Sequence, residues 1–376
     1  MHTVVLIPDS FKGTLSSRQV CRVMEQAILR RAPGIRVLSL PVADGGEGTV
    51  EAFLTALGGQ RVEAAAAGPL GLAHTGFYGL LPGGTAVVEM AACAGLPLAG
   101  PDNDPEKTTT FGVGQLFLDA LDKGARHFLV GLGGSATNDG GCGCAAACGA
   151  RFYTAGGEAF VPTGGTLKDI ARMDLSGMDR RLRDCTFTVL CDIDNPLCGE
   201  NGAAAVFAPQ KGADGAMVQR LDRGLGHLAE LWRRDLGLDL RELPGGGAAG
   251  GMGAGMAAFF GGVLRPGIDL LLDAVGFDRL AKDADLIFTG EGCLDGQTLR
   301  GKAVSGVARR AKALGVPVVA VVGGSRGCLD DLYDLGLTAA FSINRLPQTL
   351  QDSAPHAAQN LAFTMENILR LLEAAL

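Results

Sequence analysis

The stretch TVVLIPDSFKGTLSSRQVCRVMEQAI, residues 3–28, contains the pattern of a strand, a loop and a helix in direct succession. The β-branched apolar run Val4–Ile7 is typical of a strand that is buried on both faces. From Val20 to Ile28 the apolar residues instead recur at helical spacing, after a serine-rich start. This succession predicts a parallel α/β unit, in which the helix crosses over to a neighbouring strand.

The same alternation is expected at both ends of the chain but not in its middle. Further strands are predicted at 36–40, 286–289, 316–322 and 339–343, with helices between them. After Gly59, short strands separated by Gly and Pro turns favour antiparallel pairing. The glycine-rich stretch PGGGAAGGMGAG, residues 244–255, is expected to be flexible. We therefore predict an α/β protein of two domains, a doubly wound parallel sheet built from residues 1–60 and 283–376 and an inserted mixed-sheet α/β domain at 61–282.

The composition argues against several classes of protein. Of the 376 residues, 47% are apolar and 19% are charged, a balance that supports a large core rather than disorder. The net charge of −7 argues against nucleic acid and anionic membranes as partners. No apolar run approaches the roughly 18 residues of a membrane span, and the first residues lack the pattern of a signal peptide. We expect a cytoplasmic protein that acts on a small molecule, with monomer and homodimer both open.

Glycine is roughly twice as frequent as in an average protein, with 58 residues against a usual share of about 7%. Runs of glycine mark positions where the backbone takes positive φ or approaches a ligand closely. The ten cysteines include no CxxC pair, and those in CGCAAAC, residues 142–148, are expected to be small packing residues. The sequence therefore indicates a binding site that is made largely of main chain.

Two glycine-containing loops follow strands near the N-terminus, PDSFKGT at residues 8–14 and ADGGEGT at 43–49. Doubly wound sheets bind ligands at the carboxyl ends of their strands, because helix N-termini and loop amides converge there. Lys12 supplies a charge for a carboxylate or phosphate, and Asp44 suits a Mg²⁺ shell or a substrate hydroxyl. The alternative is an ordinary turn, with a solvated lysine in one loop and an acidic helix start in the other.

A third loop, GLGGSATNDGG at residues 131–141, has the composition of a phosphate-binding loop. Successive amides from Gly133 to Thr137 are expected to form an anion-binding nest, with hydroxyl donors from Ser135 and Thr137. The lysine of the GxxxxGK[ST] phosphate loop is missing. Asp139 is close enough in sequence to reach a metal ion.

Two further loops carry carboxylates. CDIDNPL, residues 191–197, ends a strand with Asp192 and Asp194, oxygen ligands that suit Mg²⁺, although an Asp-Asn-Pro turn is the alternative. TGEGCLDGQT, residues 289–298, combines an acid pair with the nearby cations Arg300 and Lys302. Phosphoryl transfer needs such a set, with a carboxylate for the hydroxyl proton and a cation over the developing charge.

Together with FAPQKGA at residues 207–213 and GGMGAG at 250–255, these loops resemble the class I glycerate kinase family, in the family's order and over essentially the whole chain. A small departure is Ala208, where glycine is common in the family. The resemblance implies a flavodoxin-like split domain, a second α/β domain and an active site in the cleft between them. It also implies that ATP, with Mg²⁺ as cofactor, phosphorylates D-glycerate to 2-phosphoglycerate. Formation of 3-phosphoglycerate is the first alternative, and a nucleotide-binding regulator without turnover is a second.

The loops and the resemblance together suggest a role for each candidate residue. As catalytic groups we expect Asp295, the general base, with Lys302 and Glu291. As substrate-binding groups we expect Ser10, Lys12, Asp44 and Arg300. As nucleotide-binding groups we expect Gly133, Gly134, Ser135, Ala136, Thr137 and Asn138, and as metal ligands Asp192 and Asp44.

Other enzyme classes fit the sequence less well. A dehydrogenase of the Rossmann type would carry GxGxxG directly after the first strand, where PDSFKG stands instead. The galactokinase-like family has a similar glycine-serine loop, but its remaining motifs are missing from this sequence. The five histidines are scattered and form no pattern of a Ser-His-Asp triad.

Overall fold

The computed structural model divides into two compact units, of which the first is formed by both ends of the chain. The first unit contains Met1–Asp44 and Pro266–Leu376, and the second contains Gly45–Arg265. The structure describes residues 2–11, 13–42, 45–46, 48–101, 103–296, 298–300 and 302–375, and the side chains of all of these except 300 and 375. In this part of the chain, no helix has the length and apolar character required to cross a membrane.

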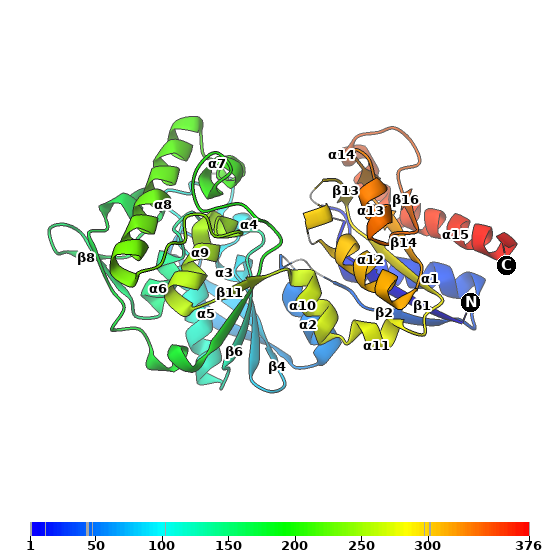
Figure 1. Ribbon diagram of the computed structural model, residues 1–376, viewed down its shortest axis with the longest axis horizontal. Coiled ribbons are helices and arrows are strands. Elements are labelled where there is room, and N and C mark those ends of the chain that lie inside the picture. Colours follow the sequence, from blue (N-terminus) through cyan, green and yellow to red (C-terminus); the bar gives the residue numbers. More distant parts are fainter. Residues whose placement is uncertain are drawn as a thin grey trace. The chain divides into compact units, whose positions relative to one another are not determined.

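A parallel sheet of five strands forms the centre of the first unit (Figure 1). Its strands are, in spatial order, β2 (Arg36–Ser39), β1 (Thr3–Pro8), β12 (Leu286–Gly290), β14 (Val318–Val322) and β16 (Ala339–Ser342). Numbered along the unit, this order is 2-1-3-4-5, the order of flavodoxin-like doubly wound sheets. Every residue of β12 and β14 is buried, which explains why these segments are apolar without alternation.

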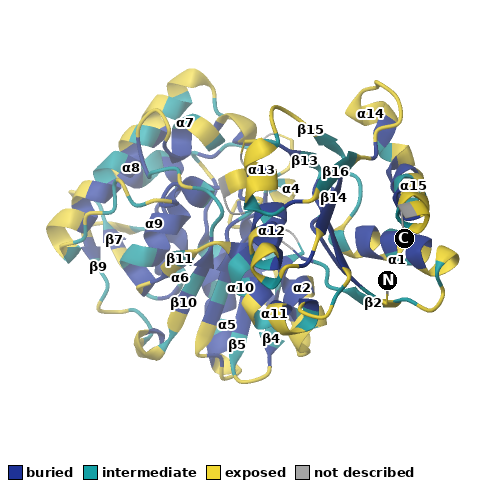
Figure 2. Ribbon diagram, turned by 45° about the vertical axis from the view of Figure 1, so that its right-hand side comes forward, coloured by how far each residue is buried: buried dark blue, intermediate teal, exposed yellow. Residues whose placement is uncertain are grey.

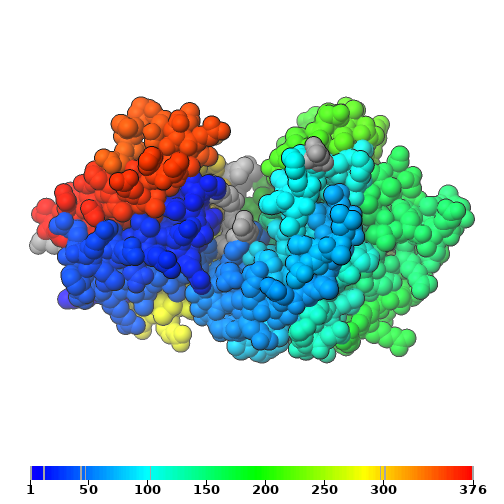
Figure 3. Space-filling view, turned by 180° about the vertical axis from the view of Figure 1, so that it is seen from behind, coloured from blue at the N-terminus to red at the C-terminus, as the bar shows by residue number. Residues whose placement is uncertain are grey.

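Helices cover both faces of this sheet. Helices α1 (Ser17–Arg31) and α15 (Ala357–Ala375) lie on one side and α12 (Ala303–Leu314) on the other (Figure 2). Because α1 packs against α15, the two ends of the chain, blue and red in Figure 3, belong to the same unit. The smaller elements are α10 (Gly267–Ala274), α11 (Phe277–Ala281), β13 (Cys293–Leu294), β15 (Gly324–Ser325), α13 (Asp330–Leu335) and α14 (Leu350–Ser353). The strands and helices expected at both ends of the chain are thus present.

A six-stranded mixed sheet forms the centre of the second unit. Its strands are, in spatial order, β11 (Val263–Arg265), β10 (Thr186–Leu190), β6 (His127–Gly131), β5 (Thr85–Glu89), β4 (Ala73–Leu81) and β3 (Gln60–Ala67). Strands β3, β4 and β5 pair antiparallel, as their turns suggested, and β5, β6, β10 and β11 pair parallel. A small antiparallel sheet contains β8 (Ala159–Phe160), β7 (Arg151–Tyr153) and β9 (Arg172–Asp174).

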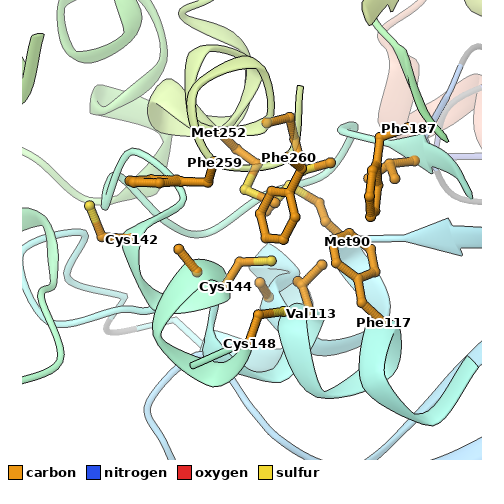
Figure 4. Close-up of a cluster of buried hydrophobic side chains, with 14 of the residues drawn as sticks. Met90, Val113, Phe117, Cys142, Cys144, Cys148, Phe187, Met252, Phe259 and Phe260 are labelled. Carbon is orange, nitrogen blue, oxygen red and sulfur yellow. The ribbon is translucent and has the colours of Figure 1, made fainter. Parts of the chain in front are cut away.

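The helices of the second unit are α2 (Thr49–Leu57), α3 (Ala91–Ala94), α4 (Leu96–Ala99), α5 (Phe111–Asp122), α6 (Cys142–Ala147), α7 (Ala203–Phe207), α8 (Gly215–Leu236) and α9 (Ala248–Phe260). Their shared core contains stacked and edge-on aromatic rings, among them Phe128 and Phe187, whose centroids are 4.7 Å apart. The thiols of Cys142, Cys144 and Cys148 lie in the same core (Figure 4). They are therefore packing residues, and burial raises the pKa of Cys142 and Cys144 well above the ordinary thiol value.

The unit boundaries lie earlier in the chain than the change of pattern at residues 60 and 283 suggested. Helix α2 packs against β4 and β5, which places residues 49–57 in the second unit. Helix α10 packs against α12, which places residues 267–274 in the first unit. The sequence of an amphipathic helix does not specify which of the two sheets it covers. The boundaries between the units therefore depend on what α2 and α10 pack against.

The glycine-rich stretch PGGGAAGGMGAG is a buried turn and helix, and the expectation of flexibility was wrong. It enters α9 through three successive left-handed residues, and most of its residues are buried. A Cβ atom on Gly250 would lie 2.0 Å from the carbonyl oxygen of Thr137, and one on Gly255 would lie 2.2 Å from that of Gly140. The glycines are needed because two backbone segments approach more closely than any side chain permits.

Candidate phosphoryl-transfer site

In the first unit, the candidate residues lie where the strand order reverses. The chain passes from β1 to β2 on one side and returns to β12 on the other, so the crevice for ligands is expected between β1 and β12. Pro8 and Gly290 pair in register at these strand ends, and the Asp9 amide donates to the Gly290 carbonyl over 2.8 Å. Ser10 and Glu291 follow directly, so the structure brings the first and the last predicted loop together at this point.

A threonine hydroxyl joins two of the three predicted catalytic residues, and the third lies beside one of them. Glu291 is 4% exposed and accepts a hydrogen bond from Thr298 Oγ1. The same hydroxyl accepts from the Asp295 amide over 3.1 Å, and Lys302 Nζ lies 3.9 Å from Asp295 Oδ1. The side chains of Asp295 and Lys302 are partly exposed. The buried Glu291 thus holds, through Thr298, the turn that contains Asp295, and Lys302 lies beside that turn.

Backbone hydrogen bonds attach this loop to the loop that follows β14. Gly323 and Gly324 donate their amides to the carbonyls of Glu291 and Gly292, each over 3.1 Å. A Cβ atom on Gly323 would lie 2.4 Å from the Gly292 oxygen, so the close pairing requires glycine there. The loop of Asp295 is therefore supported on the side of β14 as well as by Thr298.

The remaining predicted substrate-binding residues are only partly described. Ser10 is half-buried, and its amide donates to Asp9 Oδ1 over 2.6 Å. Lys12 and Asp44 lie outside the described residues, as does the side chain of Arg300. Asp9 was not predicted as a site residue, although it is a buried carboxylate at the end of β1. Its position directly after an apolar strand was the available signal.

In the second unit, four parallel strands end in one row. Glu89 pairs in register with Gly131, Gly131 with Leu190, and Leu190 with Arg265. The loops after these strands therefore share one edge of the sheet, which places the glycine loop at 131–141 beside the loop that contains Asp192. Glu89 was missed by sequence reasoning; it is buried, and its carboxylate accepts the Val50 amide over 2.7 Å at the start of α2.

The second and third glycine loops are in direct backbone contact. The Gly133 amide donates to the Gly45 carbonyl over 3.0 Å, and Gly45 has a φ of +85°. A Cβ atom on Gly131 would lie 2.4 Å from the Gly45 oxygen. These glycines allow the segment at Gly45 and the loop at 131–141, which are distant in sequence, to pack main chain against main chain.

The predicted nest of amides is smaller than expected. The amides of Gly133 and Ala136 are taken by the carbonyls of Gly45 and Ala94. In the part of the chain that the structure describes, the amides of Gly134, Ser135 and Thr137 donate to no protein group. The side chains of Thr137 and Asn138 are fully buried, so the hydroxyl of Thr137 is directed into the unit.

Asp139 does not reach toward a metal ion, contrary to expectation. Its carboxylate is fully buried and accepts hydrogen bonds from the amides of Thr110, Gly141 and Gly143 and from the Thr110 hydroxyl, at 2.7 to 3.2 Å. Burial raises the pKa of this carboxyl despite these donors. Asp139 therefore joins the starts of α5 and α6.

Asp192, which follows β10 in the chain, is half-buried, while Asp194 is exposed. The described residues contain no group of three or more His, Cys, Asp or Glu side chains that is arranged to hold a metal ion. Mg²⁺ in kinases is commonly held by one or two carboxylates together with phosphate oxygens and water, so a single Asp192 fits that kind of shell. Asp44, the other predicted ligand, is outside the described residues.

Lys211, in the FAPQKGA segment, was not predicted as a site residue. Its side chain is 1% exposed, and Nζ donates to Ser135 Oγ over 3.0 Å and to the Thr137 carbonyl over 2.7 Å. Burial lowers its pKa to about 7, although the charge of Asp139 acts in the opposite direction. The signal in the sequence was a lysine in a turn between Pro209 and Gly212, shortly after the apolar run at 203–208.

Known proteins resemble this chain over almost its full length. Residues 4–373 match the model of the Glycerate kinase family. Glycerate kinase from Halalkalibacterium halodurans is 44% identical, over 96% of this chain and 98% of that protein. Glycerate 2-kinase from Escherichia coli is 41% identical, over 98% of this chain and 97% of that protein.

A solved structure extends the likeness to the fold. The crystal structure of a proposed glycerate kinase 2 from Salmonella typhimurium LT2 covers 100% of this chain and 99% of its own, at 44% identity and a TM-score of 0.85. The strand and helix pattern, the arrangement of the loops and these likenesses lead to one assignment. The chain belongs to the glycerate kinase family of phosphotransferases.

Proposed function

We propose that this chain transfers the γ-phosphoryl group of ATP to D-glycerate, with 2-phosphoglycerate as the product. The observation that carries the proposal is the gathering of glycine and carboxylate loops, spread along the whole chain, at the carboxyl ends of parallel strands in both units. Loops of main-chain amides bind phosphates, and an acid with a nearby cation serves the acceptor hydroxyl. The family assignment supports the same reaction class.

In the proposed reaction, the hydroxyl oxygen of glycerate forms a bond to the γ-phosphorus, and the bond from that phosphorus to the bridging oxygen of ADP breaks. The hydroxyl proton passes to the carboxylate of Asp295. Lys302, 3.9 Å from that carboxylate, offsets the charge on the transferred group. Glu291 holds the Asp295 turn in place through the hydroxyl of Thr298.

The substrates are proposed to bind at two sets of residues. The carboxylate of glycerate is held by Ser10, Lys12 and Arg300, which offer amide, hydroxyl and cationic donors. The phosphates of ATP bind the loop from Gly133 to Asn138. Asp192 and Asp44 would hold Mg²⁺, which when bound supplies positive charge to the phosphates.

The choice of hydroxyl rests on one relative. The Escherichia coli protein at 41% identity is named glycerate 2-kinase, which favours the 2-hydroxyl over the 3-hydroxyl. Formation of 3-phosphoglycerate is the alternative for the same reaction. A nucleotide-binding protein without turnover is the alternative from another class.

The proposal is tested by incubating the purified chain with D-glycerate, ATP and Mg²⁺ and following ADP release with a coupled assay. The product is then identified by ³¹P NMR without proton decoupling. A phosphate on the 2-position couples to one proton and gives a doublet, whereas a phosphate on the 3-position couples to two and gives a triplet. L-glycerate serves as the control for handedness. Absence of glycerate-dependent ADP release would reject the proposed reaction and favour the regulator.

A further inference from the structure

Three of the four carbonyl groups of the loop at residues 134–137 accept hydrogen bonds from donors on other segments. A planar trans peptide directs its carbonyl and its following amide in opposite directions, so a held carbonyl also orients the next amide. The Gly134 carbonyl accepts from the Leu96 amide at 2.8 Å, that of Ala136 from Thr108 Oγ1 at 2.9 Å, and that of Thr137 from Lys211 Nζ at 2.7 Å. These bonds turn the amides of residues 135, 137 and 138 away from the donors.

When protonated, Lys211 is the strongest of these donors, because it is then the one that carries a charge. It lies at the end of the short 3-10 turn Pro209–Lys211, and its side chain is among the largest that are fully buried. A second hydrogen bond, to Ser135 Oγ at 3.0 Å, ties it to the opposite end of the same loop. A buried ammonium is costly unless it is well hydrogen-bonded. The positions of Ser135 and Thr137 are therefore coupled to that of the lysine.

The backbone around Lys211 is itself closely held. Its carbonyl accepts a hydrogen bond from Asn103 Nδ2 at 2.9 Å. The next residue, Gly212, has a φ of +98°, and a Cβ atom there would lie 2.2 Å from the Asn103 carbonyl oxygen. The lysine is therefore anchored to the residues that precede α5, independently of the loop that it supports.

A second segment, at the start of α9, packs against the Thr137 carbonyl. Gly250, at the left-handed start of α9, approaches Thr137 so closely that a Cβ atom would lie 2.0 Å from the carbonyl oxygen. The Gly250 carbonyl in turn accepts the Gly140 amide at 3.1 Å. The Thr137 carbonyl oxygen therefore lies against the backbone of Gly250 and accepts a hydrogen bond from Lys211 Nζ.

We propose that Lys211 is a positioning residue, which holds the loop at residues 134–137 so that its amides are directed to the phosphates of the nucleotide. The proposal rests on the proposed function, because the phosphate ligand is part of it. Lys211 acts through the loop and is not expected to contact the reacting atoms.

Charge gives this role a signature that packing alone would not produce. Burial lowers the pKa of Lys211 to about 7, and Asp139 is the charged group that acts on it from the neighbouring segment. A bound triphosphate favours the protonated lysine, because the negative charge nearby stabilises the cation. Nucleotide binding at pH 7.5–8 should therefore be accompanied by proton uptake.

The test uses calorimetric titration of the full chain with AMP-PNP and Mg²⁺, in two buffers that differ in ionisation enthalpy. Lys211→Met keeps the length of the side chain and removes the charge and both hydrogen bonds. We expect about 10- to 100-fold weaker binding and no proton uptake, because a charged hydrogen bond to a buried partner is lost. The KM for glycerate should change less than about threefold.

Lys107→Met is the matched control, since this lysine lies in the same unit with its side chain 75% exposed. Its nucleotide affinity should equal that of the unmodified chain. A folded Lys211→Met variant with unchanged affinity would overturn the proposal. So would an equal loss of affinity for nucleotide and glycerate, because that result indicates general loosening.

Thr108→Val decides the question if Lys211→Met does not fold. It removes only the hydroxyl that holds the Ala136 carbonyl, so we expect about 3- to 10-fold weaker AMP-PNP binding. Unchanged affinity in this variant would count against support of the loop from behind. Because binding is measured without turnover, normal AMP-PNP binding with no glycerate-dependent ADP release rejects only the proposed reaction.

Discussion

In the first unit the candidate site consists of side chains, whereas in the second unit it consists mainly of backbone. Glu291, Asp295 and Lys302 lie within twelve residues of one another in sequence. Thr298 joins the first two, and Lys302 lies 3.9 Å from Asp295. The glycine loop of the second unit depends instead on contacts from five distant segments, which contain Gly45, Leu96, Thr108, Lys211 and Gly250. Reactive side chains can be recognised from residue type, but the shape of a backbone surface depends on what packs behind it.

The largest effect is expected from Asp295→Asn in the first unit. If Asp295 accepts the hydroxyl proton, kcat should fall by about 10²–10⁴-fold, because the amide cannot take up the proton. The KM for ATP should change little, since the phosphates bind elsewhere. Asp283→Asn, at a side chain that is 85% exposed in the same unit, is the control for steady-state kinetics. Unaltered turnover in Asp295→Asn would contradict the assignment of the base.

The next largest effect should come from Gly250→Ala in the second unit. The new methyl group would overlap the Thr137 carbonyl oxygen in a left-handed conformation, so we expect a loss of about 3 kcal/mol in the free energy of unfolding. Gly215→Ala is the control, because no atom lies within 4 Å of its Cβ position at the start of α8, and a change below about 1 kcal/mol is expected. Urea unfolding measures both, and similar values for the two would show that close backbone contact is not the reason for Gly250.

A smaller effect is expected from Thr298→Val, which removes the hydroxyl between Glu291 and the Asp295 amide. We expect kcat to fall by roughly 10- to 100-fold, because a buried carboxylate loses a donor and the Asp295 turn loses a support. Thr298→Ser retains the hydroxyl and should restore most of the activity. If Val and Ser behave alike, the hydroxyl is not what holds the turn.

The smallest effect is a pH dependence of stability that Lys211 contributes. A lysine with a folded pKa of about 7 binds fewer protons in the folded than in the unfolded chain above that pH, so stability rises as the pH increases toward the unfolded value of about 10.4. Between pH 6.5 and 8.5 the free energy of unfolding should rise by about 1 kcal/mol per pH unit relative to Lys211→Met. The buried thiols lower stability as the pH approaches their ordinary pKa of 9.0, but both proteins contain them, so this effect cancels in the difference. A constant difference between the two proteins would contradict a buried, titrating lysine.

Much of the fold was accessible from sequence patterns. Apolar runs without alternation predicted the doubly covered strands of the first unit, and glycine turns predicted the antiparallel pairing of β3, β4 and β5. Patterns failed where a segment's role depends on its neighbour. The glycine-rich stretch at 244–255 has the composition of a linker, but the Thr137 and Gly140 carbonyls opposite it make it a packed helix start.

The candidate site divides in the same way. Strand ends and residue types were sufficient to place Ser10, Glu291, Asp295 and Lys302 in one region, because parallel strands end at a common edge. The burial of Asp139 and the support that Lys211 gives to Ser135 and Thr137 arise from segments that are far apart in sequence. Local periodicity and chemistry are properties of short segments, whereas burial and the direction of an amide depend on three-dimensional neighbours that no short segment specifies.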